Sequence, residues 1–316
     1  MVFCILGAGG FIGNALATYL IDKGHSIKTY DKNNINRLGD RHIDHYVGDF
    51  STEDRWSDIL LGVDVCYHFI STSLPSTSNE NPQLDVEGNI IGTIRLLDAL
   101  KNNVNVNVNV NVNVNVKLIF SSSGGTVYGF GCDGLISESD STNPICSYGI
   151  TKLSIEKYLY LYNVLYGVKS LSLRISNPYG MGQMRNISQG IIGVFLSKIK
   201  KGEKLTIWGD GSIIRDYLYI DDLVSALYTA SLYTGNVNVM NVGSGIGTSI
   251  NNILDVFKGY FNDMVVEYEP KRLFDVQSNV LNISLIQNEL GWKPEVSISN
   301  GISKIIEMNG FINKKK

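Results

Sequence analysis

The sequence Val2-Phe3-Cys4-Ile5-Leu6-Gly7-Ala8-Gly9-Gly10-Phe11-Ile12-Gly13 joins a short apolar run to three glycines spaced as G-x-x-G-x-x-G. The apolar run predicts a buried parallel strand, and a helical pattern follows the last glycine as far as Lys23. In this context Gly7 allows a tight turn, Gly10 lets the backbone approach a pyrophosphate, and Gly13 lets helix and strand pack closely. The N–H groups at the helix N-terminus suit the phosphates. The segment therefore predicts a dinucleotide-binding loop, with a plain glycine turn as the alternative.

Asp31 follows the second predicted strand, which runs from Ser26 to Tyr30. An acidic side chain at this place accepts hydrogen bonds from the adenosine ribose and repels a 2′-phosphate. The sequence therefore favours NAD over NADP as the cofactor, with Lys32 and Arg37 as mild counter-evidence.

Strand-like and helix-like segments continue to alternate along the first half of the chain. Further strands are predicted at residues 43–47, 65–70, 116–120 and 170–175, and helices at 85–100 and 147–166. This alternation indicates an α/β fold of the Rossmann type, with a doubly wound parallel sheet. Beyond Gly180 the pattern loosens. We expect a cofactor-binding Rossmann domain over residues 1–176 and a smaller mixed lobe over 177–316, with elements from about 205–242 returning to the main sheet.

Residues 104–116 form a strict alternation of asparagine and valine. A period of two suggests a strand, but asparagine is a poor strand former and the repeat has low complexity. We interpret it as an expanded surface connection without chemistry, with an extra edge strand as the alternative.

Tyr148 and Lys152 lie four residues apart in the helix predicted at 147–166, so both side chains share one face. A lysine ammonium near a phenol favours the phenolate, which would bring a tyrosine that normally titrates near 10 closer to neutrality. Three serines, Ser121 to Ser123, follow the apolar run that ends at Phe120. A serine hydroxyl there can orient a substrate hydroxyl or pass its proton. Together these residues predict a catalytic unit.

Composition narrows the classes of function. The 316 residues carry 27 basic and 30 acidic side chains, which gives no sign of a nucleic-acid or anionic-membrane surface. No apolar stretch approaches the roughly 20 residues of a membrane span, and the apolar opening is too short for a signal peptide. Four cysteines show neither metal-ligand spacing nor a disulfide framework. We therefore expect a cytoplasmic protein without a metal site and without stable membrane insertion.

Together these motifs resemble the extended short-chain dehydrogenase/reductases of the NAD-dependent epimerase/dehydratase family. Within them, the chain looks most like the nucleotide-sugar branch typified by UDP-galactose and UDP-N-acetylglucosamine 4-epimerases. The resemblance covers nearly the whole chain and includes Ser-Gly-Gly-Thr-Val-Tyr-Gly at 123–129 and Ser-Asn-Pro-Tyr-Gly at 176–180. These two stretches recur in epimerase-like enzymes of bacterial surface-polysaccharide biosynthesis.

The resemblance implies a role for each matching residue. Tyr148 would be the catalytic base, Lys152 would hold the nicotinamide ribose, and Asn177 would contact the sugar or the diphosphate. The expected catalytic residues are Ser123, Tyr148 and Lys152. The expected cofactor-binding residues are Gly7, Gly10, Phe11, Ile12, Gly13, Asp31, Asp49, Phe50, Phe69, Ser71, Asn89, Ser121, Tyr148, Lys152 and Asn177. The expected substrate-binding residues are Ser123, Tyr148, Asn177, Val194, Phe195, Thr206, Trp208, Arg215, Arg272 and Asp275.

Some of these assignments have alternatives. Asp49 could contact the adenine or could equally be a simple cap between its strand and the next helix. Arg215 and Arg272 are planar donors suited to a diphosphate, although surface ion pairs are the default for such residues. The family usually carries a serine or threonine at the place of Gly124, so Ser123, one residue earlier, fills the third catalytic place only if the backbone shifts at Gly124-Gly125.

The resemblance implies an NAD-dependent nucleotide-sugar 4-epimerase that removes hydride from C4 of the sugar and returns it to the opposite face. A bulky tyrosine of glucose-restricted members is replaced by Asn279, which would leave room for a 2-acetamido group. We therefore hypothesise that UDP-GlcNAc and UDP-GalNAc are accepted, besides UDP-Glc and UDP-Gal. A homodimer through the helices at 85–100 and 147–166 is also implied, and the tyrosines at 158, 160, 162 and 166 could serve that surface or the core.

Three other functions are alternatives to a 4-epimerase. A 4,6-dehydratase needs an acidic pair at the places held by Gly125 and Thr126, so the sequence disfavours it. A nucleotide 4-keto-sugar reductase using NAD(P)H would share the same Ser/Tyr/Lys set. A non-catalytic dinucleotide-sensing protein would commonly lack the Tyr/Lys pair, which is intact here.

Overall fold

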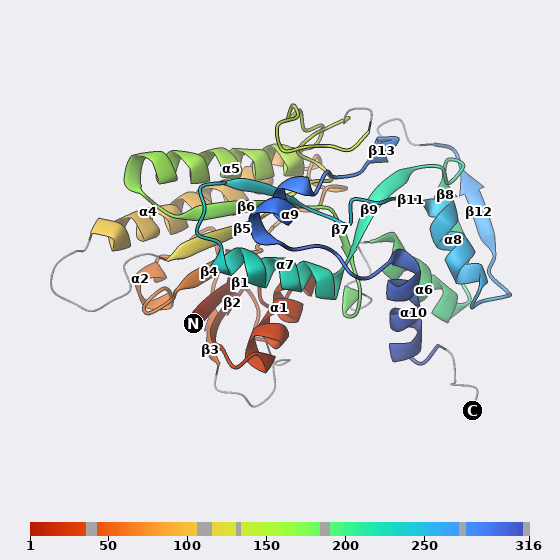
Figure 1. The fold of residues 1–316 in the computed structure, drawn as a ribbon, viewed down its shortest axis with the longest axis horizontal. Coiled ribbons are helices and arrows are strands. Elements are labelled where there is room, and N and C mark those ends of the chain that lie inside the picture. The colour runs from red at the N-terminus through yellow and green to blue at the C-terminus, as the bar shows by residue number, and fades with distance from the viewer. Residues whose placement is uncertain (36–42, 106–115, 131–133, 184–189, 272–275, 312–316) are drawn as a thin grey trace. The chain divides into compact units, whose positions relative to one another are not determined.

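The computed structural model describes residues 1–35, 43–105, 116–130, 134–183, 190–271 and 276–311 (Figure 1). Its central sheet contains seven strands in the order β10-β6-β5-β4-β1-β2-β3. These strands are β1 (Val2–Leu6), β2 (Ser26–Asp31), β3 (Asp44–Val47), β4 (Val65–His68), β5 (Lys117–Ser123), β6 (Ser170–Ile175) and β10 (Val239–Val242). The pairs from β3 through β5 are parallel, so the predicted doubly wound parallel sheet is confirmed.

The order of the strands reverses between β1 and β4. At such a reversal the connections leave toward opposite sides, and the carboxyl ends of the two strands border a crevice where α/β proteins bind ligands. The glycine loop follows β1 at this edge, and the segment from Phe69 to Ser73 follows β4. The topology therefore brings together the cofactor motif and the loop in which the sequence predicts further contacts.

Helices cover both faces of the sheet (Figure 1). Cys4 and Leu6 of β1 point to the face covered by α2 (Trp56–Ile59), α4 (Gly92–Asn105) and α5 (Ser147–Tyr166), where they join one buried apolar cluster. Phe3 faces the opposite side, where its ring stacks on Tyr67 at 6.0 Å. On that side α1 (Phe11–Asp22) buries Leu16 and Leu20. Since both faces are covered, β1 is a continuous apolar run and not an alternating one.

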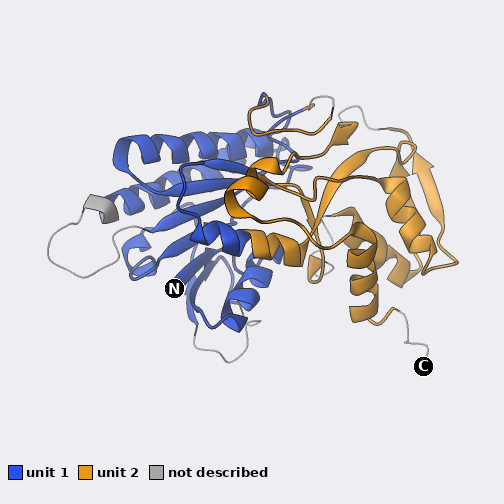
Figure 2. Ribbon diagram, in the orientation of Figure 1, with its two compact units in different colours: residues 1–129, 141–174, 227–240 blue, residues 130–140, 175–226, 241–316 orange. Residues whose placement is uncertain are grey.

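The chain divides into two compact units (Figure 2). Unit 1 contains residues 1–129, 141–174 and 227–240, and unit 2 contains residues 130–140, 175–226 and 241–316. Of the three strands described between residues 205 and 242, β10 lies in the seven-stranded sheet. By contrast, β8 (Leu205–Trp208) pairs with β12 (Val266–Glu269), and β9 (Ile214–Tyr219) belongs to a separate four-stranded sheet.

The four-stranded sheet of unit 2 is built around β9. Its neighbours are β11 (Gly247–Ser249), β13 (Ser278–Asn279) and β7 (Asn177–Tyr179). The helices described wholly within this unit are α6 (Ile191–Lys201), α8 (Ile250–Lys258), α9 (Ser284–Leu290) and α10 (Ile298–Met308). Helix α7 (Ile220–Leu232) begins in unit 2 and ends in unit 1. The carboxyl of Asp216, in β9, is fully buried and accepts hydrogen bonds from the N–H groups of Ser244, Gly245 and Leu281.

The helix predicted at residues 85–100 is interrupted. It comprises α3 (Pro82–Asp85), a π-helical segment η1 (Val86–Ile91) and α4. Within it, the Asn89 amide donates to the carbonyl of Asp85 at 2.8 Å, and Thr93 Oγ1 donates to the carbonyl of Asn89 at 2.6 Å. Side-chain donors that bind helical carbonyls compete with the regular ladder, and π-helical turns of this kind gather at functional sites.

The role of the asparagine–valine repeat and the absence of a membrane span were also predicted from the sequence. Most of the asparagine–valine repeat, residues 106–115, lies outside the described residues, so its predicted role stays a prediction. Across the part of the chain that the structure describes, no helix combines the length and the apolar character needed to cross a bilayer.

Candidate active site

The glycine loop has the close contacts that its spacing predicts. Gly7 has φ of +86° and donates its N–H to the carbonyl of Tyr30 at 2.8 Å. A Cβ on Gly13 would lie 2.3 Å from the Gly7 carbonyl oxygen, so no other residue fits there without displacing the loop. The loop can therefore approach a phosphate with its backbone only because these positions carry no side chain.

Asp31 is tied directly to this loop. Its Oδ2 accepts the N–H of Gly9 at 2.9 Å, and its Oδ1 accepts the N–H of Asn33 at 3.2 Å. The partly exposed carboxylate is thus fixed at the end of β2, next to the turn where a dinucleotide would place its ribose. This placement agrees with the predicted role of Asp31 in selecting NAD.

Tyr148 and Lys152 lie on the first turns of α5, and Lys152 is 4% exposed. Its Nζ donates to the carbonyl of Ser121 at 2.8 Å and lies 5.6 Å from the centroid of the Tyr148 ring. The Nζ also lies 4.7 Å from the ring centroid of Phe120. The end of β5 therefore holds the ammonium in place, and the predicted Tyr–Lys pairing on one helix face is present.

Burial controls the proton equilibria of this pair. It lowers the pKa of Lys152 to about 8, against the opposing effect of the Asp85 and Glu156 carboxylates. Burial also raises the pKa of the Tyr148 phenol above its ordinary value of 10, and Cys146 and Asp85 add to that rise. The predicted lowering of this phenol pKa by Lys152 is therefore wrong for the polypeptide by itself. The ammonium bonds to a backbone carbonyl and faces the ring, so loss of hydration outweighs its attraction for a phenolate.

A buried ionic network joins α5, which carries Tyr148 and Lys152, to β5 and β6. Arg174 in β6 contacts Glu156 at 2.7 Å between Nη2 and Oε2, and its Nη1 donates to the Tyr128 hydroxyl at 2.9 Å. The Ser122 hydroxyl donates to the same Glu156 carboxylate. Since Glu156 lies one helical turn after Lys152, this network fixes α5 against β5 and β6. Sequence reasoning singled out the serine cluster but missed Glu156 and its contact with Ser122, which appears only once the three elements are adjacent.

Asn89 is 3% exposed and holds the loop after β4. Its Oδ1 accepts the N–H of Thr72 at 2.9 Å, and its Nδ2 donates to Thr72 Oγ1 at 2.8 Å. The predicted contact of Asn89 with the cofactor remains a prediction, because the side chain binds neighbouring protein groups.

The other predicted cofactor residues of unit 1 surround the same strand ends. Asp49 Oδ1 accepts the N–H of Ser51 at 3.0 Å in the turn after β3, whereas the N-cap of α2 is Arg55, so Asp49 does not cap that helix. Phe50 is buried against Trp56 and His68. Phe69 stacks on Tyr67 at 5.7 Å, and the exposed Ser71 donates to the carbonyl of Ser73. Phe11 and Ile12 begin α1, and Ser123 is the last residue of β5.

The predicted substrate residues described in unit 2 lie on several elements. Asn177 Nδ2 donates to the carbonyl of Asp216 at 3.0 Å, and Arg215 Nη1 donates to the carbonyl of Val276 at 2.7 Å. Val194 is half-buried on α6, where Phe195 packs on Phe257 in the core. Thr206 and the partly exposed Trp208 lie on β8. Arg272 and Asp275 lie outside the described residues, so their roles stay predictions.

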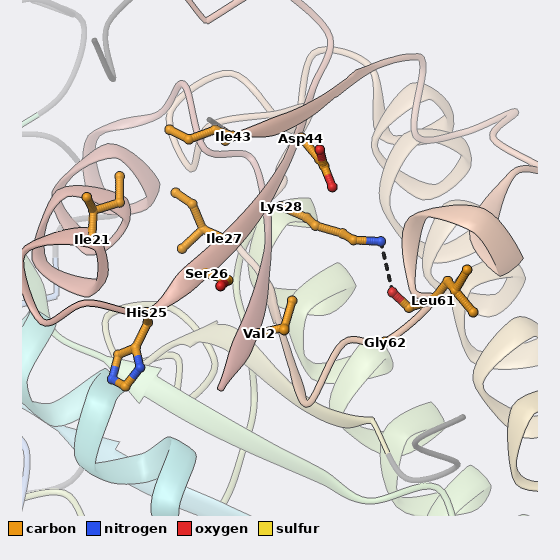
Figure 3. A pocket seen from close by; sticks show the side chains of 10 residues that line it. All are labelled: Val2, Ile21, His25, Ser26, Ile27, Lys28, Ile43, Asp44, Leu61 and Gly62. Atoms are coloured by element: carbon orange, nitrogen blue, oxygen red, sulfur yellow. Dashed lines mark hydrogen bonds between the residues drawn. The ribbon is translucent and has the colours of Figure 1, made fainter. Parts of the chain in front are cut away.

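A cavity of about 500 Å³ lies at the opposite edge of the sheet (Figure 3). Val2 and Ser26, at the amino ends of β1 and β2, line it together with Lys28 and Asp44. The Lys28 ammonium donates to the carbonyl of Leu61 at 2.9 Å at its rim. The cavity is therefore separate from the glycine loop and from the Tyr148–Lys152 pair.

A glycine loop, an acidic residue ending β2 and a Tyr–Lys pair on α5 are the arrangement typical of dinucleotide sites in short-chain dehydrogenase/reductases. Residues 3–243 match the model of the NAD dependent epimerase/dehydratase family. The chain belongs to this family, and its cofactor is NAD.

Three known proteins are similar over almost their full length. The chain is 30% identical over 311 residues to a putative UDP-glucose 4-epimerase of Methanocaldococcus jannaschii, covering 96% of both. It is 31% identical over 313 residues to a dTDP-4-dehydro-6-deoxyglucose reductase of Escherichia coli, again covering 96% of both. The UDP-glucose 4-epimerase of Thermotoga maritima, solved with UDP-glucose, is similar with a TM-score of 0.88 at 30% identity, covering 97% of this chain and 98% of that one.

The residues present fit NAD. The close packing of Gly13 on Gly7 leaves the loop backbone open to a pyrophosphate, and Asp31 is held beside that loop by Gly9. Lys152 is held at the end of β5, in reach of the same strand edge.

The shifted pKa of Lys152 makes stability depend on pH. Unfolded chains keep this lysine protonated up to an ordinary pKa of 10.5, whereas the folded protein releases the proton near 8. Between these values the unfolded state binds more protons, so wild-type stability rises with pH. Relative to Lys152→Met, the wild-type free energy of unfolding should rise by up to about 3 kcal/mol from pH 8 to 10.5. Urea unfolding of both proteins across this range measures it, and a pH-independent difference would contradict the assignment.

Proposed function

We propose that this protein is an NAD-dependent nucleotide-sugar 4-epimerase. The observation that carries the proposal is the Tyr148–Lys152 pair, fixed by the Ser121 carbonyl at the edge of the sheet that bears the glycine loop. Similarity to the two UDP-glucose 4-epimerases over nearly the whole chain supports the choice of reaction. Motifs shared with polysaccharide-cluster enzymes suggest that the product is a sugar donor for surface polysaccharide, made in the cytoplasm.

Each residue has a distinct task in the proposed reaction. Tyr148 takes the proton of the sugar 4-hydroxyl as C4 is oxidised, and gives it back after the ring has turned over. Lys152, held by the Ser121 carbonyl, positions the nicotinamide ribose and supplies positive charge to the phenolate. When bound, NAD supplies hydride acceptance and return at C4, together with a cationic ring that offsets the raised pKa of the phenol.

Ser123 is proposed as the third catalytic residue. It ends β5, and its carbonyl accepts the N–H groups of Thr126 and Val127 at 3.3 and 3.1 Å. The chain therefore turns immediately after Ser123. This turn keeps the serine at the carboxyl end of the strand although glycine occupies the usual place at 124.

Tyr148→Phe tests the proposed base. Removing the hydroxyl should lower turnover of UDP-hexoses by at least about a hundredfold, because general-base catalysis is worth that much or more. The measurement is the rate of C4 epimerisation followed by NMR, with circular dichroism to show an intact fold. Tyr160→Phe is the matched control, because Tyr160 lies on the same helix but is 57% exposed. Near-normal turnover by Tyr148→Phe would exclude the role.

We further propose that N-acetylhexosamine nucleotides are substrates. Asn279 lies in β13 directly beside Arg215 of β9, so a small side chain stands next to a proposed diphosphate ligand. Incubation with UDP-GlcNAc and UDP-Glc should give both C4 epimers, analysed by NMR. Turnover of UDP-Glc alone would refute the acceptance of the acetamido group.

A nucleotide 4-keto-sugar reductase is the second candidate. The 31% identity to the reductase of Escherichia coli favours it, and the same Tyr–Lys pair could deliver a proton to a ketone. Cofactor stoichiometry separates the two functions. An epimerase leaves NADH absorbance unchanged over many turnovers, whereas a reductase consumes one NAD(P)H for each sugar.

A homodimer is proposed through α4 and α5. Leu161, Val164 and Leu165 form an exposed apolar stripe on α5, and Val164 is 61% exposed. Tyr160 also belongs to this surface, whereas Tyr162 is buried and donates to Asp98 of α4 at 2.7 Å.

Val164→Glu tests this interface. A charge in the centre of an apolar interface should convert a wild-type dimer to a monomer, measured as molar mass by light scattering. Val265→Glu places the same charge at a residue of unit 2 that is 54% exposed, and it should stay dimeric. A monomeric wild type, or a dimeric Val164→Glu variant, would contradict the interface.

A further inference from the structure

Asp85 is a buried carboxylate that binds three separate segments of unit 1. It is 1% exposed and lies at the end of α3. Its Oδ2 accepts the hydroxyls of Ser147 at 2.7 Å and Thr151 at 2.8 Å. Its Oδ1 accepts Nδ2 of Asn89 at 2.8 Å and the hydroxyl of Ser73. A carboxylate that accepts four donors compensates the cost of its burial, so the arrangement is specific and not incidental.

The two hydroxyls bound by Oδ2 immediately precede the catalytic pair in the chain. Ser147 comes directly before Tyr148, and Thr151 comes directly before Lys152. Spaced four residues apart, Ser147 and Thr151 occupy one helix face, just as the catalytic pair does. One carboxylate therefore fixes the rotation of the first turns of α5. The nearby N–H groups of Ser147 and Tyr148 also bind Asn79 and Ser78, at 2.8 and 3.0 Å.

The other two donors connect the carboxylate to the loop after β4. Ser73 belongs to that loop, and Asn89 holds Thr72 of the same loop through two hydrogen bonds. The loop stands at the carboxyl end of β4, beside the strand reversal where the cofactor binds. Asp85 thus joins the helix of the catalytic pair to the wall of the cofactor site.

We propose that Asp85 is a positioning residue, whose carboxylate holds Tyr148 and Lys152 at the angle needed for proton transfer at the cofactor edge. This inference rests on the proposed epimerase function. It adds a fourth functional side chain that acts through Ser147 and Thr151 without touching substrate.

The charge of Asp85 acts on the same pair. It opposes the burial that lowers the pKa of Lys152, and it contributes to the raised pKa of Tyr148. Glu156 on α5 and the Cys146 thiol also act on this pair, and Lys152 in turn lowers the pKa of His68 on β4. Removing the charge at Asp85 should therefore lower both pKa values, whereas these other groups stay in place.

Asp85→Asn is the direct test. It keeps the size of the side chain but loses the charge and one pair of acceptor positions. We expect kcat to fall at least about tenfold with KM changed less than about threefold, because misplacement affects the chemical step more than sugar binding. Both limbs of the pH profile of kcat should move to lower pH. A purely structural role would lower the melting temperature without moving the profile.

Two sets of variants make the test decisive. The double variant Ser147→Ala, Thr151→Ala keeps the charge of Asp85 but removes its two hydrogen bonds to α5. We therefore expect kcat to fall while the pH profile stays in place. Asp98→Asn is the matched control, because Asp98 also accepts a hydroxyl from α5, that of Tyr162, which lies nearly three turns beyond Lys152. It should leave kcat and the profile unchanged. If Asp85→Asn does not fold, the double variant decides, and an unchanged kcat there overturns the proposal.

A readout without substrate separates this proposal from the proposed function. The pKa of Lys152 can be followed by NMR in protein labelled at lysine, with Lys152→Met to assign the signal. In Asp85→Asn it should fall below the wild-type value, and an unchanged value with an unchanged pH profile overturns the role of Asp85. If the wild type epimerises no nucleotide sugar but the lysine pKa still falls, the proposed reaction fails and the electrostatic link between Asp85 and Lys152 stands.

Discussion

The buried ammonium of Lys152 is the charge on which the site depends. It has lost most of its water and bonds to the carbonyl of Ser121, in a region where Asp85 and Glu156 are the carboxylates that favour its charged form. Burying a charge is costly unless it is compensated, so the surrounding elements must be placed accurately. The end of β5, helix α5 and the end of α3 all contribute to that compensation. The geometry of the candidate active site is thus also a requirement for stable folding.

The same constraint explains why the tyrosine is not acidic in the polypeptide itself. Desolvation raises the pKa of Tyr148, and the Lys152 Nζ lies 5.6 Å from the centroid of its ring. Activation of the phenol then depends on the positive charge that NAD brings when it binds. Without that charge the phenol stays protonated near neutral pH.

The sequence predicted the parts of the fold that depend on local pattern. The glycine spacing from Gly7 to Gly13 specified the turn, because only residues without a Cβ fit against the neighbouring backbone. The four-residue spacing of Tyr148 and Lys152 specified their common helix face. Asp85 and Glu156 escaped prediction, because single acidic residues in helices carry no local signal. Their roles become apparent only in the fold, which brings Ser147 and Thr151 to Asp85 and Arg174 to Glu156. The raised pKa of Tyr148 escaped prediction for a similar reason, since burial cannot be read from spacing.

The central claim is that hydride leaves C4 of a nucleotide sugar and returns to the same carbon within one active site. The most direct measurement is the fate of deuterium at C4 of a UDP-hexose incubated with the protein, followed by NMR and mass spectrometry of the product. The account predicts a C4 epimer that keeps the deuterium at C4, with no exchange into water and no net formation of NADH. An epimer that has lost the label to solvent, or a product formed with stoichiometric cofactor turnover, would contradict it.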